Sequence, residues 1–295
     1  MVETGKRIAP YVFISPFLIL FAVFGIFPIL YSITISFFKW TLAGPQDFRG
    51  IQNYISLLTT DPFFIGSLKT TFILLVFGSL LQHVFAIPLA IVLNDQKVKG
   101  RGFFKVMYFL PYITSTVVIA LVFNQLYEQN YGWFNFVIEN WLGMEGVKWV
   151  QNPGAIKASI AIMVNWRFIG WNTIIYLAGL QSIDKVLYEA AEIDGASVWQ
   201  QETLITLPVV WGIIVTAMTL AMAYGLRHFE ATFLMTGGGP GHSTSTLALM
   251  MYDKIGARKL GQASTIGTIL VIVGFIVIVT LNQTLGRKSL TGEDQ

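Results

Sequence analysis

Long runs of residues without a charged side chain divide this sequence and limit what it can fold into. Six runs reach or approach the roughly 20 apolar residues that a helix needs to cross the hydrocarbon core of a bilayer. They are Ile8–Phe38, Thr70–Asn94, Val106–Tyr127, Ala158–Ile183, Thr203–Leu226 and Leu260–Gly286, of which only the fourth is interrupted by a charged residue, Arg167. The alternation over about ten residues that is typical of membrane β-barrels is absent from the sequence. The runs therefore predict an all-α polytopic membrane protein.

We expect six transmembrane helices in a single domain over residues 1–295, at about residues 11–38, 70–93, 106–127, 158–181, 206–227 and 263–285. The first run has 31 residues without a charge, which is far longer than the 7–15-residue core of a cleaved signal peptide. An uncleaved span behind Lys6 and Arg7 is therefore favoured over the alternative of a signal peptide.

Composition excludes several other classes of protein. Charged residues make up 12% of the chain, about half the share in soluble domains, which argues against a soluble enzyme. The net charge of +3 is small, and no basic run with interleaved aromatic residues indicates a nucleic-acid partner. The sequence has no cysteine, so disulfides and thiolate metal sites are ruled out. No His, Asp and Glu cluster suggests a metal, and no Ser, His and Asp arrangement suggests a catalytic triad.

The loop between the second and third runs indicates the orientation. Lys97, Lys99, Arg101 and Lys105 cluster there, and positively charged loops favour the cytoplasmic side. Six spans then place both termini in the cytoplasm, together with the segment 182–205.

The segment 182–205 predicts two short helices. The first runs from about Lys185 to Asp194 and stops at Gly195, a residue that readily takes the left-handed conformation that ends helices. The second starts at Ser197, and Gln200 three residues later has the spacing of a capping box. Small residues flanked by acidic ones suit docking into a groove of a partner; they are Ala190, Ala191, Gly195 and Ala196, flanked by Glu189 and Asp194.

This segment resembles the cytoplasmic loop motif of bacterial ABC importer permeases. The matching stretches are Glu189-Ala190-Ala191, Asp194-Gly195-Ala196 and Ile205-Thr206-Leu207-Pro208. The resemblance implies that residues 182–205 are the coupling loop, which sits in a cleft of the ATP-hydrolysing subunit. The ATPase-coupling residues it implies are Glu189, Ala190, Ala191, Asp194, Gly195, Ala196, Leu207 and Pro208. One departure is Glu202, which stands where sugar permeases usually carry Phe.

Three further stretches are similar to sugar permeases. They are FRGIQNYISLLTTDPFF at 48–64, LAGLQSI at 177–183 and TGGGPGHSTSTLALMMY at 236–252. The last stretch is typical of the first of two permeases in carbohydrate importers, the MalF- or UgpA-like subunit. The resemblance implies a heterodimer with a second related permease, two ABC ATPase subunits and an extracytoplasmic solute-binding protein, in the prokaryotic cytoplasmic (inner) membrane.

The glycine run at 237–241 is the closest approach to a nucleotide-binding motif. A P-loop needs a Lys followed by Ser or Thr after its last glycine, and no such pattern occurs in the chain. The chain is therefore not expected to be an enzyme or to hold a cofactor, and ATP and Mg²⁺ belong to the partner ATPase.

Polar residues near the end of the fifth run are candidates for the solute path, because polar groups inside a membrane are costly. They are Tyr224, Arg227, His228 and Glu230. Arg227 and Glu230 are three residues apart and are expected to pair on one helix face. The resemblance implies that this stretch contributes to a transmembrane sugar site, and the alternative is an interfacial ion pair.

The fourth run adds Asn165, Trp171 and Asn172 to the candidate solute path. The two asparagines are seven residues apart and share a helix face, and tryptophan offers a surface on which a sugar ring stacks. The alternative is an aromatic belt at the membrane interface, with Arg167 extending outward to water, and for Arg167 itself this structural reading is favoured.

Together these features predict the permease subunit of an ATP-driven, binding-protein-dependent importer of a sugar or related polar solute, working by alternating access. The alternatives are a secondary transporter driven by an ion gradient, a membrane component without transport activity and, within the family, an importer of glycerol phosphates or polyols. Gly195→Asp is predicted to abolish uptake and to leave membrane insertion intact.

Overall fold

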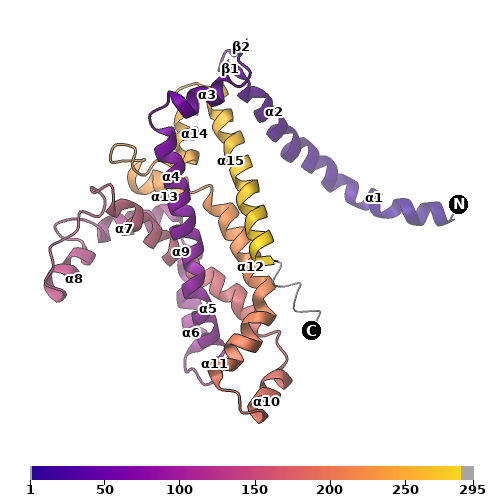
Figure 1. Cartoon of the computed structure of the whole chain (residues 1–295), viewed down its shortest axis with the longest axis vertical. Coiled ribbons are helices and arrows are strands. Elements are labelled where there is room, and N and C mark those ends of the chain that lie inside the picture. The colour runs from indigo at the N-terminus through magenta and orange to yellow at the C-terminus, as the bar shows by residue number, and fades with distance from the viewer. Residues whose placement is uncertain (1, 287–295) are drawn as a thin grey trace. The chain divides into compact units, whose positions relative to one another are not determined.

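The computed structural model describes residues 2–286 and is mostly helical (Figure 1). It forms two compact units. The first unit consists of residues 2–62 and 250–271, and the second of residues 63–249 and 272–286.

The elements follow one another along the chain, with π-helical turns labelled η. They are α1 (Val2–Phe21), η1 (Ala22–Ile26), α2 (Phe27–Ser36), β1 (Phe38–Thr41), β2 (Gly44–Phe48), α3 (Gln52–Thr59), α4 (Phe64–Leu74), η2 (Leu75–Leu80), α5 (Leu81–Asn94), α6 (Arg101–Ile113), α7 (Thr116–Leu126), α8 (Trp133–Trp141), α9 (Ala155–Leu180), α10 (Lys185–Ile193), α11 (Val198–Gln201), η3 (Glu202–Thr206), α12 (Leu207–Gly225), α13 (Glu230–Thr236), α14 (Leu247–Gly256), α15 (Leu260–Leu281) and η4 (Asn282–Gly286).

Four continuous helices in the described residues are long and apolar enough to cross a membrane. They are Tyr11–Ser36, Phe64–Asn94, Val198–Gly225 and Leu260–Gly286. The pair α6 and α7 makes a fifth if it is counted as one bent span. The 26-residue helix α9 covers the fourth predicted span, but it is not among these helices because Asn165, Arg167 and Asn172 lower its hydropathy.

The third predicted span is not one helix. Residues 106–127 were expected to form a continuous span, but α6 and α7 meet at an angle of 99°. Thr114 and Ser115 separate them in extended conformations, with ψ of 143° and 133°. The prediction of a single helix here is wrong, and the break places the start of α7 beside elements that the sequence did not connect with it.

The first unit contains a β-hairpin that the all-α prediction did not include. Strands β1 and β2 pair antiparallel with an irregularity between Lys39 and Trp40. Gly44 enters β2 with φ of +99°, a conformation that favours glycine. The hairpin is anchored by Asn53, whose Nδ2 donates to the carbonyl oxygens of Ser36 (2.8 Å) and Phe38 (2.9 Å).

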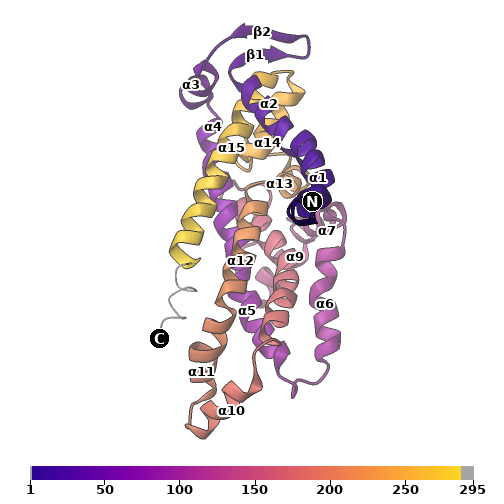
Figure 2. The ribbon, with the colours of Figure 1, turned by 90° about the vertical axis from the view of Figure 1, so that its right-hand side faces the viewer.

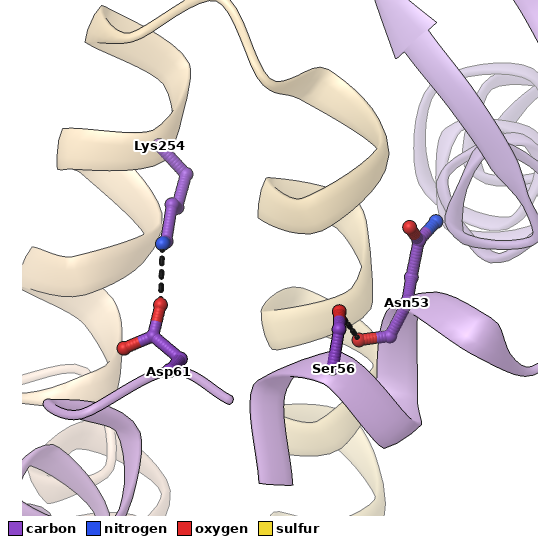
Figure 3. Close-up of polar contacts among 4 residues, drawn as sticks. All are labelled: Asn53, Ser56, Asp61 and Lys254. Atoms are coloured by element: carbon purple, nitrogen blue, oxygen red, sulfur yellow. Dashed lines mark hydrogen bonds and ion pairs between the residues drawn. The ribbon is translucent and has the colours of Figure 1, made fainter. Parts of the chain in front are cut away.

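Two further contacts stabilise the first unit, and Figure 3 shows both of them. Lys254 Nζ and Asp61 Oδ2 form an ion pair at 2.6 Å. Ser56 Oγ donates to the backbone oxygen of Asn53 at 2.9 Å, within α3. The ion pair joins α14 to the segment that follows α3, and the hydrogen bond lies within α3.

Helix α9 lies at the centre of the second unit and contacts α5, α6 and α12. Its Gly170 allows the close approach of α6, because a Cβ atom there would overlap the carbonyl oxygen of Tyr108. Buried polar groups pair across helices, as Tyr176 OH and His83 Nδ1 do at 2.6 Å. Such pairing is needed where no water reaches a polar side chain.

Candidate functional site

Two regions of the second unit carry the predicted functional residues. The first is the elbow, which we define as residues 184–206 and which contains α10, α11 and η3. Asp184 caps the N-terminus of α10, and its Oδ1 accepts from the backbone N–H of Val186 at 3.0 Å. It ends in a Schellman motif, in which Ala196 N–H donates to Ala191 O (2.9 Å) and Gly195 N–H to Glu192 O (3.1 Å).

The second part of the elbow is continuous with a spanning helix. Ser197 and Gln200 form the expected capping box, with Ser197 N–H donating to Gln200 Oε1 at 2.8 Å and Gln200 N–H to Ser197 Oγ at 3.4 Å. From Val198 the helix runs without a break to Gly225. The π-helical turn η3 lies directly before Pro208, which cannot donate a helical hydrogen bond.

The elbow carries large apolar side chains that no other part of the described chain covers. The exposed fractions are 86% for Ile193, 73% for Val198, 77% for Trp199 and 72% for Leu204, and we call these four residues the elbow patch. Exposed apolar side chains of this size at one site are typical of a surface that another protein covers. Figure 2 shows α10 and α11 together at one end of the second unit, and Figure 1 agrees.

The predicted coupling residues lie around this patch. Glu189, Ala190, Asp194, Gly195 and Pro208 are exposed, whereas Ala191, Ala196 and Leu207 are partly buried. A Cβ atom on Gly195 would meet nothing within 4 Å, and its φ is +78°. The glycine is therefore required by its backbone conformation, and the space around it is open to a partner.

Tyr188 links the elbow to the spanning helix. Its hydroxyl group lies 2.8 Å from Thr206 Oγ1, so α10 is connected to η3 as well as to α11. A groove of about 1020 Å³ separates the elbow from the loop at 94–101. Glu202, the departure from the expected pattern, lines this groove, as do the cations Lys97, Arg101 and Lys185 and the carboxylates Asp95 and Glu192.

The second region is the polar cavity, a space of about 250 Å³ between α7, α9, α12 and α13. Its polar and aromatic lining residues are Thr116, Arg167, Phe168, Tyr224, Arg227, His228, Phe229 and Glu230. All four candidates from the fifth run therefore line one cavity. Hydrogen-bonding groups beside aromatic rings are the surroundings that a sugar needs, because its hydroxyl groups are polar and its ring faces are apolar.

Hydrogen bonds fix two of these residues. Thr116 Oγ1 donates to Glu230 Oε2 at 3.0 Å, and the buried His228 has its Nε2 2.9 Å from Ser79 Oγ. The expected pairing of Arg227 with Glu230 on one helix face is wrong. Helix α12 ends at Gly225 and α13 begins at Glu230, so Arg227 lies in the break between the two helices and the two residues share no helix face.

Arg167 faces the cavity, whereas an outward course to water was the alternative favoured from the sequence. Its guanidinium carbon lies 5.3 Å from the ring centre of Phe168. Its Nε is buried and has no hydrogen-bond partner among the described residues. One N–H group of the guanidinium therefore lacks a hydrogen-bond acceptor among the described residues.

The candidates from the fourth run lie elsewhere. Asn165 Nδ2 donates to the carbonyl oxygens of Phe77 (2.6 Å) and Ala161 (2.7 Å), and Asn172 Nδ2 to that of Phe168 (3.0 Å). Trp171 stacks on Tyr112, with ring centres 4.4 Å apart. None of the three candidates lines the polar cavity.

Sequence reasoning missed Arg167, Thr116, Phe168 and Phe229 as lining residues. A signal existed for Arg167, since a charge in a membrane run is expected to face the interior of the bundle. No signal existed for Thr116, because its position depends on the break between α6 and α7.

Residues 7–290 match the model of a family described as "Binding-protein-dependent transport system inner membrane component". The chain is 33% identical over 98% of its length to the arabinooligosaccharides transport system permease protein AraP of Bacillus subtilis (strain 168), of which the match covers 91%. It is 31% identical over 91% to the trehalose/maltose transport system permease protein MalF of Thermococcus litoralis, again with 91% covered. A solved bacterial ABC transporter for the acidic polysaccharide alginate has a chain with a TM-score of 0.82, 25% identity and coverage of 97% of this chain and 98% of that one.

Proposed function

The chain belongs to the family of inner-membrane components of binding-protein-dependent transport systems, and from this premise we propose that it is the first of two permeases in an ATP-driven sugar importer. The curated relatives named above are permease subunits that are named for oligosaccharides and disaccharides. A sugar is therefore the solute class that we propose for this chain as well.

The observation that carries the proposal is the exposed elbow at the start of a spanning helix. The elbow patch and the open Gly195 present a surface for a partner, and α12 continues from α11 without a break. We propose that an ABC ATPase binds the elbow. When two such ATPases close on ATP, the movement of the elbow passes directly into α12.

Helix α12 leads to the polar cavity, which we propose as part of the solute path. Tyr224 lies in the last turn of α12, and Arg227 and His228 follow it directly. A displacement of the elbow along the helix therefore changes the cavity, which is what alternating access requires. The ring faces of Phe168 and Tyr224, 5.1 Å apart between centres, offer apolar cover for a sugar, and Arg167 offers a hydrogen-bond donor.

We further propose that α9 and the bent pair α6–α7 are spans alongside the four continuous ones, which gives six. Six spans put both termini on the cytoplasmic side with the elbow, in agreement with the basic loop at Lys97–Lys105. A second permease, two ATPases and an extracytoplasmic solute-binding protein complete the importer. ATP and Mg²⁺ are bound by the ATPases in this proposal.

The test of ATPase binding is co-purification of the complex after the elbow patch is changed. We expect Ile193→Ser with Trp199→Ser to lower the amount of ATPase recovered with the permease about tenfold or more, because apolar anchors carry most of the energy of an interface. Phe136→Ser with Trp141→Ser, which changes two exposed apolar residues of α8, is the matched control. Equal recovery of the ATPase with wild type, the elbow-patch variant and the α8 control variant would contradict the proposal.

The solute class is tested on the cognate binding protein by a thermal-shift screen. A neutral oligosaccharide is expected to raise its melting temperature more than glycerol phosphates or polyols do. A phosphate- or sulfonate-bearing compound as the strongest hit would rule out a neutral sugar.

A further inference from the structure

The first unit contains a cavity of about 150 Å³ beside its β-hairpin. Three cationic residues line it, Lys39 of β1, Arg49 after β2 and Lys259 before α15. No Asp or Glu is among the lining residues. Asp47 is opposite Lys39 in the hairpin register, but it is exposed and does not line the cavity. The cavity therefore carries an excess of positive charge.

The backbone of the unit brings the three cations together. Arg49 N–H donates to Phe37 O at 2.8 Å, which fixes Arg49 beside the start of β1. Gly261 allows the first turn of α15 to lie directly against β1, because a Cβ atom there would overlap the carbonyl oxygen of Phe38. Lys259 precedes this turn, so the same close approach places it near Lys39.

The beginning of α15 adds hydrogen-bond donors to the cavity. The helix has 22 residues, and its first backbone bond runs from Ala263 N–H to Lys259 O at 3.0 Å. The N–H groups before Ala263 lie outside the helical ladder, where a helix carries the positive end of its dipole. Among the described residues, no ion pair neutralises any of the three cations. Charge, donors and space together fit an anionic group.

Gln262 needs a hydrogen-bond donor, which an anion without a hydroxyl group does not provide. Its side chain lines the cavity, and its Oε1 is buried without a hydrogen-bond partner in the part of the chain that the structure describes. A buried acceptor without a donor is costly. A ligand that carries a hydroxyl group next to its anionic group would satisfy both Gln262 and the cations.

The cavity lies where two spanning segments end. The segment Tyr11–Ser36 stops two residues before β1, and the segment Leu260–Gly286 starts at the cavity itself. Trp40 lines the cavity and packs edge-on against Tyr31 and Phe38, with ring centres 5.9 and 6.2 Å apart. Tryptophan and tyrosine are typical of the headgroup level of a bilayer. The cavity therefore opens where phospholipid headgroups are concentrated.

We propose that this cavity binds the headgroup of phosphatidylglycerol in the leaflet next to the β-hairpin. The phosphodiester lies among Lys39, Arg49 and Lys259, and a glycerol hydroxyl group donates to Gln262 Oε1. The ligand is a structural lipid that holds the hairpin to the start of α15. This site is independent of the sugar path and of ATPase binding.

Native mass spectrometry of the delipidated full-length permease tests the site, with phosphatidylglycerol or phosphatidylcholine added back. We expect wild type to retain phosphatidylglycerol preferentially. Lys39→Gln, Arg49→Gln and Lys259→Gln together should weaken this retention at least about tenfold, because each cation near a membrane surface contributes to the binding of anionic lipid. The matched control is Lys97→Gln, Lys99→Gln and Lys105→Gln, which removes the same charge away from the cavity and should change retention of the lipid in the cavity less than about twofold, because none of the three lysines lines it.

Phosphatidylmethanol, which has the same phosphodiester but no hydroxyl group, tests the role of Gln262. Wild type should prefer phosphatidylglycerol to phosphatidylmethanol, and Gln262→Leu should remove the preference. The proposal is overturned if the cavity variant retains phosphatidylglycerol as wild type does, or if phosphatidylcholine is retained equally. It is also overturned if inorganic phosphate binds while the lipid does not. The same holds if the cavity variant still retains the lipid and the only change is that it no longer binds the solute-binding protein.

Discussion

At the scale of single residues, Arg167 is the most informative side chain. A charged residue in the middle of an apolar run must reach water, a partner or a cavity. The sequence favoured water, whereas the structure places Arg167 at the polar cavity with a buried Nε that lacks a partner. The difference arises because a residue's direction on a helix is known only once the neighbouring helices are placed.

Arg167 and Trp171 allow the cavity residues to be separated from the other candidates by mutation. Arg167→Gln should lower the initial rate of uptake about tenfold or more, because it removes a charge-assisted donor from the lining of the cavity. Trp171→Phe should change the rate less than about twofold, since its ring stacks on Tyr112 outside the cavity and Phe keeps an aromatic face there. Uptake of radiolabelled solute in intact cells measures both rates. A larger loss in the Trp171 variant would show that the path follows another face of α9.

Glu230 offers a second residue-level prediction. Its carboxylate accepts a hydrogen bond from Thr116, so it joins α13 to the first turn of α7. Thr116→Val should weaken uptake severalfold because it removes the hydrogen bond that joins α13 to α7 beside the cavity, whereas Thr116→Ser keeps the hydroxyl group and should keep the uptake rate. Initial uptake rates at equal permease abundance provide the measurement, and equal rates in the Val and Ser variants would contradict a role for the hydroxyl group.

At the scale of elements, helix ends marked by local capping residues were easier to predict than breaks within an apolar run. The elbow follows from capping chemistry within a few residues, namely Asp184, Gly195 and the Ser197–Gln200 pair. The break between α6 and α7 follows from extended conformations at Thr114 and Ser115, two residues that carry no strong turn signal. The hairpin at 38–48 was missed for a different reason: its strands of four and five residues are too short to show alternation.

Gly195 is the element-level test of the elbow. Gly195→Asp should reduce uptake to background while the protein still inserts into the membrane, since the added carboxylate would occupy the open surface next to the elbow patch. Gly143→Asp is the matched control. Gly143 also follows a helix, has φ of +64° and has nothing within 4 Å of its Cβ position, so backbone strain is similar in both variants. Equal uptake by the two variants would mean that strain, and not docking, explains the loss.

Gly170 tests the packing of α6 against α9. Gly170→Ala should lower the free energy of unfolding by about 1–3 kcal/mol, because its methyl group would overlap the carbonyl oxygen of Tyr108. Gly212→Ala lies in α12 with nothing within 4 Å and should keep or raise stability, since alanine favours helix by about 1 kcal/mol. Thermal unfolding in detergent measures both. A stable Gly170 variant would show that the two helices are not in close contact.

At the scale of the whole molecule, the charge-free runs predicted a helical membrane protein, and the family match supports that assignment. What the sequence alone did not predict is how residues from separate runs meet. The polar cavity gathers Thr116, Arg167 and Glu230 from three different helices. The periodicity of a sequence indicates the faces of one helix at a time. It does not show which helices pack together, and that packing forms the cavity.

The energy source of transport tests the central claim most directly. Proteoliposomes would contain this permease, its partner permease and the ATPases, with the solute-binding protein and labelled sugar outside. We predict sugar accumulation with ATP and Mg²⁺ in the lumen and none when a non-hydrolysable analogue replaces ATP, even with Na⁺ and H⁺ gradients held across the membrane. Accumulation that continues without ATP hydrolysis and follows an ion gradient would contradict an ATP-driven importer.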